Sequence, residues 1–335
     1  MSEAMRSSMT VKYNEKETNI SDECESFTWT DCAGGEADTI SMQMPNKNQK
    51  WMKGYKPGRA DYIKAWIKVS NWQEGKKDAK QFCGKFYIDL IQYAGFPERT
   101  DLSGISVPIG NGFNVRQRNK TWKKTSVRAV LEEIAKRAGI KLQYDAADHK
   151  IDSISQNGKT DLEFAFDICS EYDRQLKIYN GKMVVYDQTD YEKKEAKHTI
   201  KRTELGGGES YSIKLQTTKV YNGVKIQYTS GKDKVLTYEF KRPGTNGTRQ
   251  MFVTAKAESL QDAEKKAKAA LRKNAREETT GTIRIMGNPS YVAAQNIKME
   301  GFGKLDGKYF IEKVIHTKNR SYTTTLYIHK TVTDF

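Results

Sequence analysis

The sequence predicts a β-dominated α+β protein, with a β module at each end of the chain and a small α/β module between them. Three observations predict this fold class. Polar and apolar residues alternate over much of the first third of the chain. Between Trp122 and Asp187 the apolar period lengthens to that of an α-helix. After Glu209 the alternation typical of strands returns.

Length and composition set the size of the cores. At 335 residues, the chain is long enough for two or three domains, each able to bury a core without metals or disulfides. Apolar residues make up 37% of the chain and charged residues 30%. The cores are therefore modest, and much of the surface is predicted to face water or partners.

The first β module begins with two clear strand patterns. In residues 37–44, one face carries Ile40, Met42 and Met44. In residues 61–69, one face is apolar, with Ile63, Ala65, Ile67 and Val69, and the other carries Tyr62, Lys64, Trp66 and Lys68. Because the second face holds two aromatic residues among lysines, we expect something to cover it.

The middle of the chain predicts a helix, strand, helix, hairpin unit. A helical apolar stripe begins at Val127 and ends at Gly139, and the strand 140–144 follows. Thr160-Asp161-Leu162-Glu163 has the pattern of a capping box that opens a helix through about Tyr172. Asn180-Gly181 predicts a tight hairpin turn between strands 176–179 and 183–186.

Beyond the α/β module, residues 190–209 are charged and end in three glycines, a composition that predicts a linker. Asn222-Gly223 predicts a second hairpin turn, and residues 235–241 a further strand. A long helix is predicted from a Ser259 cap to about Glu278. Residues 296–331 predict antiparallel strands around turns at Asp306-Gly307 and Asn319-Arg320.

The net charge of +15 raises the possibility of a nucleic-acid or acidic partner. Positive residues are scattered through nearly every segment, which weakens that interpretation. The densest cluster is Lys265, Lys266, Lys268, Arg272, Lys273 and Arg276. Its spacing favours the solvated outer face of a helix, with direct phosphate binding as the alternative.

The sequence contains no recognisable catalytic or metal-binding motif. No metal-ligand spacing links the four histidines, His149, His198, His316 and His329. His316 and His329 could meet across the last hairpin, but we expect such a pair on a strand face to be an ordinary part of the surface. Cys24, Cys32, Cys83 and Cys169 contain no CxxC pair and predict buried, reduced thiols. The Gly-rich loops 110–112 and 206–208 lack the Lys-Ser or Lys-Thr of a phosphate loop. We therefore predict no enzyme, catalytic residue, cofactor or metal.

The order of several short motifs resembles the phage late control D family, the baseplate hub proteins of contractile tails, in the short form of PBSX-like tails. The N-terminal motifs are Phe27–Asp31, Gly35–Asp38, Trp51–Gly58 with Asp61, Asn71-Trp72, Cys83–Asp89 and Gly95–Pro97. The central positions are Leu131, Ile134, Ala135, Gly139, Leu142, Tyr144, Gln156, Asp161 and Phe164, and the C-terminal motifs are Gly307–Val314 and Tyr322–Leu326. The resemblance runs from about residue 20 to about residue 330.

The resemblance implies two β-barrel tube domains with an inserted small α/β domain. Residues 1–20 would form an N-terminal arm, 21–115 the first tube domain, 116–190 the α/β domain, and 191–335 the second tube domain with one long helix at about 259–278. Three such chains would form a pseudo-six-fold ring that joins a six-fold tail tube to a three-fold central spike.

The same resemblance implies partners and a place in the particle. The partners would be two further copies of the chain, the central spike protein, the tail tube protein, the tape measure protein and baseplate wedge proteins, with no membrane and no specific nucleic acid. The N-terminus matches no secretory signal and no segment predicts a membrane helix, so we expect assembly in the host cytoplasm. The resemblance implies that the assembled protein ends in the baseplate of a phage tail or tail-like particle. The expected ring-interface residues are Ile40, Met42, Tyr62, Trp66, Tyr309 and Tyr322.

Two other function classes remain open from the sequence. The charge and the interleaved aromatics also fit a nucleic-acid-binding β-barrel protein, for which salt-sensitive binding of oligonucleotides would speak. A polysaccharide hydrolase with two unmarked carboxylates is the other alternative, and turnover of cell-wall material abolished by one acidic substitution would favour it.

Overall fold

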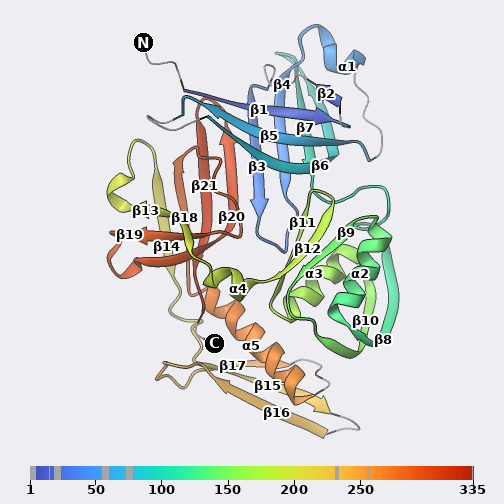
Figure 1. The fold of residues 1–335 in the computed structure, drawn as a ribbon, viewed down its shortest axis with the longest axis vertical. Coiled ribbons are helices and arrows are strands. Elements are labelled where there is room, and N and C mark those ends of the chain that lie inside the picture. The colour runs from blue at the N-terminus through green and yellow to red at the C-terminus, as the bar shows by residue number, and fades with distance from the viewer. Residues whose placement is uncertain are drawn as a thin grey trace.

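In the computed structural model, the described residues are 5–14, 16–18, 24–54, 60–72, 78–230, 234–254, 257, 259–333 and 335. Within them, strands from both ends of the chain form one 13-stranded sheet. Figure 1 shows an α/β module beside this sheet and a helix-and-sheet unit at the end away from the N-terminus. Residues 55–58 of the Trp51–Gly58 motif lie outside the described residues.

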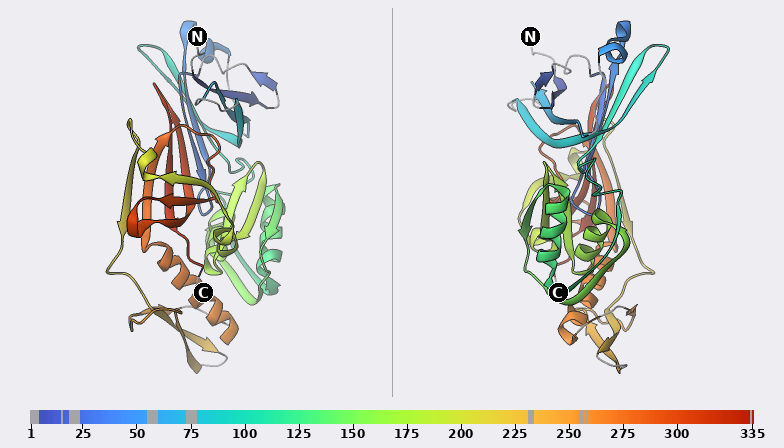
Figure 2. Two further views of the ribbon diagram at one scale, coloured as in Figure 1. Left: turned by 60° about the vertical axis from the view of Figure 1, so that its left-hand side comes forward. Right: turned by 90° about the vertical axis from the view of Figure 1, so that its right-hand side faces the viewer.

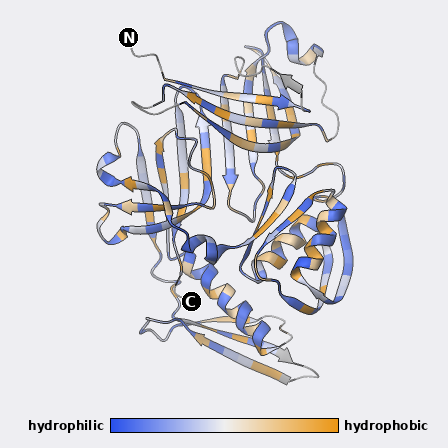
Figure 3. Cartoon of the chain, in the orientation of Figure 1, coloured by the Kyte–Doolittle hydropathy of each residue, from blue (hydrophilic) through white to orange (hydrophobic). Residues whose placement is uncertain are grey.

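The first β module folds around its own core. It contains β1 (Arg6–Tyr13), β2 (Lys16–Thr18), β3 (Ser26–Cys32), β4 (Thr39–Pro45), a 3-10 turn (Lys47–Gln49), α1 (Lys50–Gly54), β5 (Tyr62–Ser70), β6 (Ala79–Ala94) and β7 (Arg99–Ile105). In Figure 1, β1, β5 and β6 cross in front of β3, β4 and β7. The apolar face predicted for each of the two sequence patterns is buried between these layers, from Ile40 on β4 to Ile63 and Ile67 on β5. Figure 3 shows the alternation of polar and apolar residues along these strands.

The second β module continues the same sheet. It contains β13 (Ala196–Lys201), a 3-10 turn (Arg202–Glu204), β14 (Ser210–Leu215), β18 (Thr279–Met286), β19 (Asn296–Glu300), a 3-10 turn (Gly303–Leu305), β20 (Gly307–Lys318) and β21 (Tyr322–Lys330). Strand β20 pairs antiparallel with β3, so that Val314 lies opposite Asp31 and His316 opposite Trp29. This pairing, here called the seam, joins the two β modules.

The α/β module lies between them in the chain. It contains β8 (Gln117–Ser126), α2 (Val127–Ala138), β9 (Lys141–Asp145), β10 (Lys150–Thr160), α3 (Asp161–Glu171), β11 (Arg174–Tyr179), β12 (Lys182–Asp187) and α4 (Gln188–Lys193). The local predictions are confirmed: Gly139 ends α2 in the left-handed conformation, and Thr160 forms the capping box of α3. Asn180 and Gly181 take the positive φ angles of the tight turn between β11 and β12.

A fourth unit, the α5 unit, interrupts the second β module. It contains β15 (Gly223–Ser230), β16 (Lys234–Lys241), β17 (Gln250–Thr254) and α5 (Leu260–Arg276), with Ser259 capping the helix as predicted. The small side chains Ala263 and Ala267 pack α5 closely on the sheet. Both views in Figure 2 show this unit at the end of the molecule opposite the N-terminal strands.

Two sequence predictions about this half of the chain are wrong. Residues 190–209 are not simply a linker, since they include the end of α4 and the whole of β13. The charged residue Glu192 is fully buried there because cations from other elements compensate it. Asn222-Gly223 is not a hairpin turn either, because β14 pairs with β18 and β15 pairs with β16 and β17. Gly223 instead allows close packing, since a Cβ there would lie 2.6 Å from the backbone oxygen of Phe240.

The fold class predicted from the sequence is confirmed: the chain is a strand-dominated α+β protein with an inserted α/β module. The predicted burial of the four cysteines is confirmed as well. Among the described residues, no helix is both long enough and apolar enough to cross a membrane.

Candidate functional site: the junction between modules

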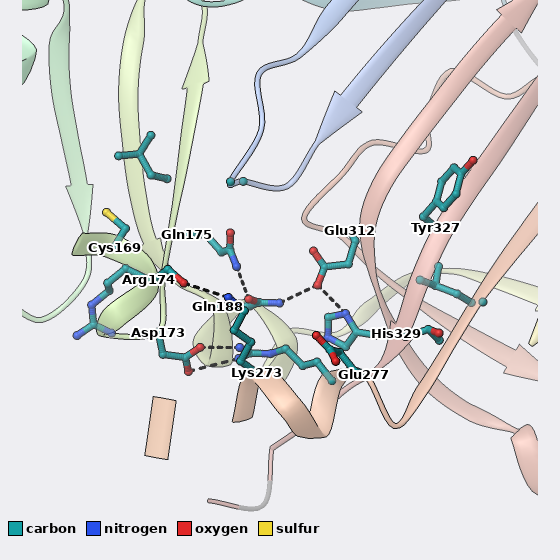
Figure 4. Close-up of a pocket in the computed structure, with 18 of the residues that line it drawn as sticks. Cys169, Asp173, Arg174, Gln175, Gln188, Lys273, Glu277, Glu312, Tyr327 and His329 are labelled. Atoms are coloured by element: carbon teal, nitrogen blue, oxygen red, sulfur yellow. Dashed lines mark hydrogen bonds and ion pairs between the residues drawn. The ribbon is translucent and has the colours of Figure 1, made fainter. Parts of the chain in front are cut away.

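A polar cavity lies at a junction where three units of the molecule meet. Its volume is about 700 Å³, and it is bordered by the α/β module, the second β module and α5. Figure 4 shows side chains from these units converging on it, with Asp173 and Arg174 on one side and Glu312 and His329 on the other. The sequence predicted none of these residues as a site.

Arg276, near the C-terminal end of α5, is the central cation of the junction. Its Nη1 donates to Asp173 Oδ1 at 2.5 Å, and its Nε donates to Glu192 Oε1 at 2.6 Å. All three residues are less than a tenth exposed. Burial lowers the pKa of Arg276, but the two carboxylates outweigh that effect and raise it above its ordinary value. The network therefore ties α5 to the α/β module through two buried ion pairs.

His329 on β21 extends this network to the second β module. Its Nε2 lies 3.3 Å from Glu192 Oε1, and its Nδ1 lies 2.8 Å from Glu312 Oε1. Burial lowers the pKa of His329, but its contacts with the two negatively charged glutamates outweigh burial and raise the pKa. Gln188 donates to Glu312 at 3.2 Å, so a chain of polar contacts crosses the cavity, as Figure 4 shows.

The basic cluster of α5 is therefore not a solvated face throughout, which corrects the sequence interpretation. Lys266 is 9% exposed and Arg276 is 7% exposed. Lys266 Nζ lies 2.8 Å from Glu171 and 3.1 Å from Asp262. Spacing along a helix identifies which residues share a face, but it does not reveal that carboxylates of the α/β module lie opposite that face.

A second buried ion cluster joins the α/β module to the first β module. Lys177 on β11 contacts Asp31 on β3 and lies 2.9 Å from Asp38 Oδ2. Asp31 also accepts a hydrogen bond from the backbone N–H of Ala293 at 2.7 Å, in the second β module. Burial lowers the pKa of Lys177, but the two aspartates outweigh it and raise the pKa above its usual range. Burial raises the pKa of Asp38 to about 7, against the opposing charge of Lys177.

A glycine turn between β3 and β4 completes the contact. A Cβ on Gly34 would lie 2.5 Å from Gln175 Oε1 and 3.0 Å from the backbone oxygen of Leu176, so only glycine lets the turn approach β11 this closely. The N–H of Gly35 donates to Leu176 O at 3.0 Å. The motif residues Asp31, Gly35 and Asp38 thus hold the α/β module in place.

Aromatic packing reinforces the seam between the β modules. The rings of Trp29 and His316 stack with their centroids 4.9 Å apart. His316 contacts Tyr322 Oη through Nδ1 at 2.8 Å and the backbone oxygen of Tyr291 through Nε2 at 3.0 Å. Burial lowers the pKa of His316 to about 4. Since His316 pairs with Thr324 and His329 with Phe310, the two histidines do not meet across the hairpin, and neither is a surface residue.

The expected ring-interface residues fall into two groups. Ile40, Met42, Tyr309 and Tyr322 are at most 3% exposed and lie in the cores of the two β modules. Their side chains contact their own chain, because a strand pattern identifies the buried face without telling a core from an interface. Tyr62 and Trp66 lie on the outer face of β5, partly exposed. Contact of these two side chains with another subunit stays a prediction.

The charged side chains of the junction and of the Lys177 cluster connect the units of the molecule to one another. The buried carboxylates of Asp173, Glu192, Asp31 and Asp38 all have cationic partners. Among the described residues, no group of three or more His, Cys, Asp and Glu side chains has the arrangement of a metal site. Such a network is suited to fixing the orientation of units relative to one another.

Comparisons with known proteins show which solved structures share this fold. No family model matches the chain. Over 97% of its length it superimposes on a tail protein from Neisseria meningitidis, covering 96% of that chain, with a TM-score of 0.71 and 15% identity. It also superimposes, over 97% of its length and 78% of the other chain, on an Escherichia coli component of the type VI secretion system, with a TM-score of 0.59 and 10% identity. The chain therefore shares its fold with a tail protein and with a component of the type VI secretion system.

Sequence similarity links the chain to two curated phage proteins. The chain is 25% identical over 222 residues to a probable baseplate hub protein of Escherichia phage P2, and 24% identical over 233 residues to a probable baseplate hub protein of Escherichia phage 186. These matches cover 64% and 67% of the chain and 54% and 56% of the relatives, so the chain spans about half the length of the curated relatives it matches. The resemblance to baseplate hub proteins predicted from the motifs is confirmed.

Proposed function

We propose that the chain is a structural, non-enzymatic baseplate hub subunit of a contractile phage tail or tail-like particle. The similarity to two baseplate hub proteins and the tail-protein fold support this role. In the proposed assembly, three copies form a pseudo-six-fold ring that joins the six-fold tail tube to the three-fold central spike. The tape measure and baseplate wedge proteins are further proposed partners, and assembly is proposed to begin in the host cytoplasm.

The observation that carries the proposal is the seam. Because β20 and β3 pair along six residues of each strand, the two β modules form one continuous sheet within each copy. A subunit that supplies two neighbouring positions of a six-fold ring needs its two modules at a fixed angle. The buried ion clusters of Lys177 and Arg276 support that requirement, since they fix the α/β module and α5 against the sheet.

A complex with a spike-type protein is part of the proposal. Another superposition, with a TM-score of 0.58 and 9% identity, covers 98% of this chain and 58% of a chain in a Francisella PdpA-VgrG complex. This likeness concerns the fold alone. It motivates testing the chain together with the spike protein of its own particle.

Electron microscopy of the purified chain, alone and mixed with that spike protein, tests the proposal. We expect rings with a central hole in at least the mixture, and light scattering at the mass of three chains. A chain that stays monomeric at high concentration in both samples would overturn the proposal. Salt-sensitive binding of oligonucleotides without ring formation would favour the alternative of a nucleic-acid-binding protein.

A further inference from the structure

The turn that joins β3 to β4, here called the docking turn (residues 33–38), holds the α/β module on the first β module. Tyr186 Oη on β12 donates to the backbone oxygen of Ala33 at 2.9 Å. The N–H of Gly35 donates to a backbone oxygen of β11 at 3.0 Å. Figure 1 shows β3 ending beside β11 and β12. Asp38 closes the turn and is 1% exposed, so a change in its charge takes place inside this contact.

The buried cluster beside the docking turn holds more negative than positive groups. Among the described residues, it consists of two carboxyl groups, Asp31 and Asp38, and one cation, Lys177. Ionisation of both aspartates would leave one negative charge uncompensated, although both residues are less than a tenth exposed. Burial of an unpaired charge costs far more than burial of a neutral carboxyl group. One of the two aspartates is therefore favoured to hold a proton.

The hydrogen bonds identify Asp38 as that residue. A lysine ammonium has three N–H donors. Those of Lys177 are all in use, with the acceptors Asp31 Oδ1, Cys32 O and Asp38 Oδ1. Asp31 Oδ2 accepts from the backbone N–H of Ala293. Asp38 Oδ2 lies 2.9 Å from Lys177 Nζ, but it has no hydrogen-bond partner within the described part of the chain. Because a buried anionic oxygen without a donor is unfavourable, the proton belongs on this atom.

Other titratable groups around the cluster keep a single charge state near neutral pH. They are Cys32, Cys83, Tyr179, Tyr186 and His316. Burial raises the pKa of the thiols and phenols and lowers the pKa of His316 to about 4, so all of them are neutral from about pH 5 to about pH 9. Lys313 on β20 is paired with Glu36 of the docking turn at 2.6 Å. In contrast, burial raises the pKa of Asp38 to about 7.

We propose that Asp38 and Lys177 form a proton-operated latch for the α/β module. With a proton on Asp38 Oδ2, the cluster has no net charge and the docking turn lies tightly on β11. When the O–H bond breaks and the proton passes to water, the cluster becomes negative and the contact opens more often. The seam has its own backbone pairing, so the latch loosens the α/β module without separating the β modules. This inference does not rest on the proposed hub function.

The direction of the pH effect follows from the raised pKa of Asp38. In the closed latch this pKa is about 7, whereas the ordinary value is 3.8. The stabilisation by the proton is therefore fully present below the ordinary value and is lost as pH rises through the folded value. Each pKa unit between the closed and open states changes the opening equilibrium tenfold. The latch is tightest in acid and loosest above neutral pH.

Hydrogen exchange at the Gly35 amide measures how often the latch opens. We would compare its protection factor at about pH 5 and about pH 8 in the native chain and in the variants Asp38→Asn and Asp167→Asn. In the native chain, protection should fall at least about tenfold between the two pH values, with a smaller change at the amides of the seam.

The two variants separate Asp38 from other carboxyl groups. Asparagine at position 38 is neutral at both pH values and keeps the oxygen that accepts from the Cys32 N–H, so protection of Gly35 should then be independent of pH. Asp167 on α3 is 55% exposed, and the Asp167→Asn control should show the fall of the native chain. Equal protection at both pH values in the native chain would overturn the proposal. The native fall in the Asp38→Asn variant would also overturn it, because another group would then be responsible.

Infrared spectroscopy of the native chain decides the question even if the Asp38→Asn variant fails to fold. A protonated carboxyl group has a C=O band that disappears on ionisation. We expect one such band to persist above the titration of the exposed carboxyl groups and to disappear as pH rises through about 7. If the native chain has no carboxyl band that titrates near neutral pH, Asp38 is ionised in the closed state and the latch does not exist.

Discussion

Trp29 and His316 stack across the seam at an interplanar angle of 12°, one ring from the third strand of the chain and the other from the last-but-one. Trp29 is 1% exposed and His316 is fully buried. Two residues from opposite ends of the sequence thus form the packed centre of the connection between the β modules.

Replacing Trp29 with alanine should remove this packing. Loss of a buried aromatic side chain typically costs about 3–5 kcal/mol, so we expect the Trp29→Ala variant to lose that much free energy of unfolding. Denaturant titration followed by circular dichroism measures it. Phe96→Ala is the control, because Phe96 is 93% exposed and should change stability by less than about 0.5 kcal/mol. Equal stability of the two variants would contradict a structural role for the stack.

Replacing Arg276 with methionine should destabilise the junction. The change keeps an aliphatic side chain but leaves Asp173 and Glu192 without their main cation, and breaking a buried pair costs about 3–5 kcal/mol. The control is Arg128→Met on α2, where the arginine is 56% exposed and its pair with Glu132 is worth less than about 1 kcal/mol. If calorimetry gave both variants the same melting temperature, the junction would not depend on Arg276.

The stability contributed by His329 should depend on pH. Its pKa is raised in the folded state, so protonation stabilises the fold fully below the unfolded pKa of about 6.5, and this contribution is lost as pH rises through the folded pKa. The free-energy difference between the native chain and a His329→Gln variant should therefore be largest in mild acid and shrink in alkali. Denaturant titrations over a pH series measure this difference.

The stability contributed by His316 should depend on pH in the opposite direction. Burial holds its folded pKa at about 4, so its neutral form stabilises the fold above the unfolded pKa of about 6.5, and this contribution is lost as pH falls toward about 4. A His316→Gln variant should lack this loss. The same pH trend in the His316 and His329 variants would contradict the two assigned protonation states.

Substituting Gly34 with alanine should loosen the contact between the β3–β4 turn and β11. The new Cβ would meet a backbone oxygen at 3.0 Å as well as Gln175, so the turn has to shift. We expect faster hydrogen exchange at the Gly35 amide, which donates to Leu176 in the native fold. Gly54→Ala is the matched control, because nothing lies within 4 Å of its Cβ position. Unchanged exchange in the Gly34 variant would mean that the turn tolerates the methyl group.

Local sequence signals predicted elements whose determinants lie within a few residues. The Thr160 capping box, the Gly139 helix end and the Asn180-Gly181 turn each depend on the conformation of neighbouring residues. The signals at Asn222-Gly223 and in residues 190–209 failed because distant segments decide those structures. Gly223 lies in a strand sheltered by β16, and β13 exists because β19 pairs with it.

The junction residues were missed for the same reason. Lys177 is an ordinary lysine in a strand pattern, and only the fold brings Asp31 and Asp38 to it. The motifs Phe27–Asp31 and Gly35–Asp38 carried part of this information, since their acidic and glycine residues make the contact. The opposite partner, Lys177, has no local signal that separates it from surface lysines.

The seam also has a consequence for synthesis on the ribosome. Strand β3 emerges early, but its partner β20 is translated only near the C-terminal end of the chain. Until then, the nascent first module carries an unpaired strand edge beside an incompletely covered tryptophan. Pairing of such remote segments is slow, and exposed edges associate with other chains. The nascent chain therefore has its greatest need of chaperone protection in the interval between the emergence of these two strands.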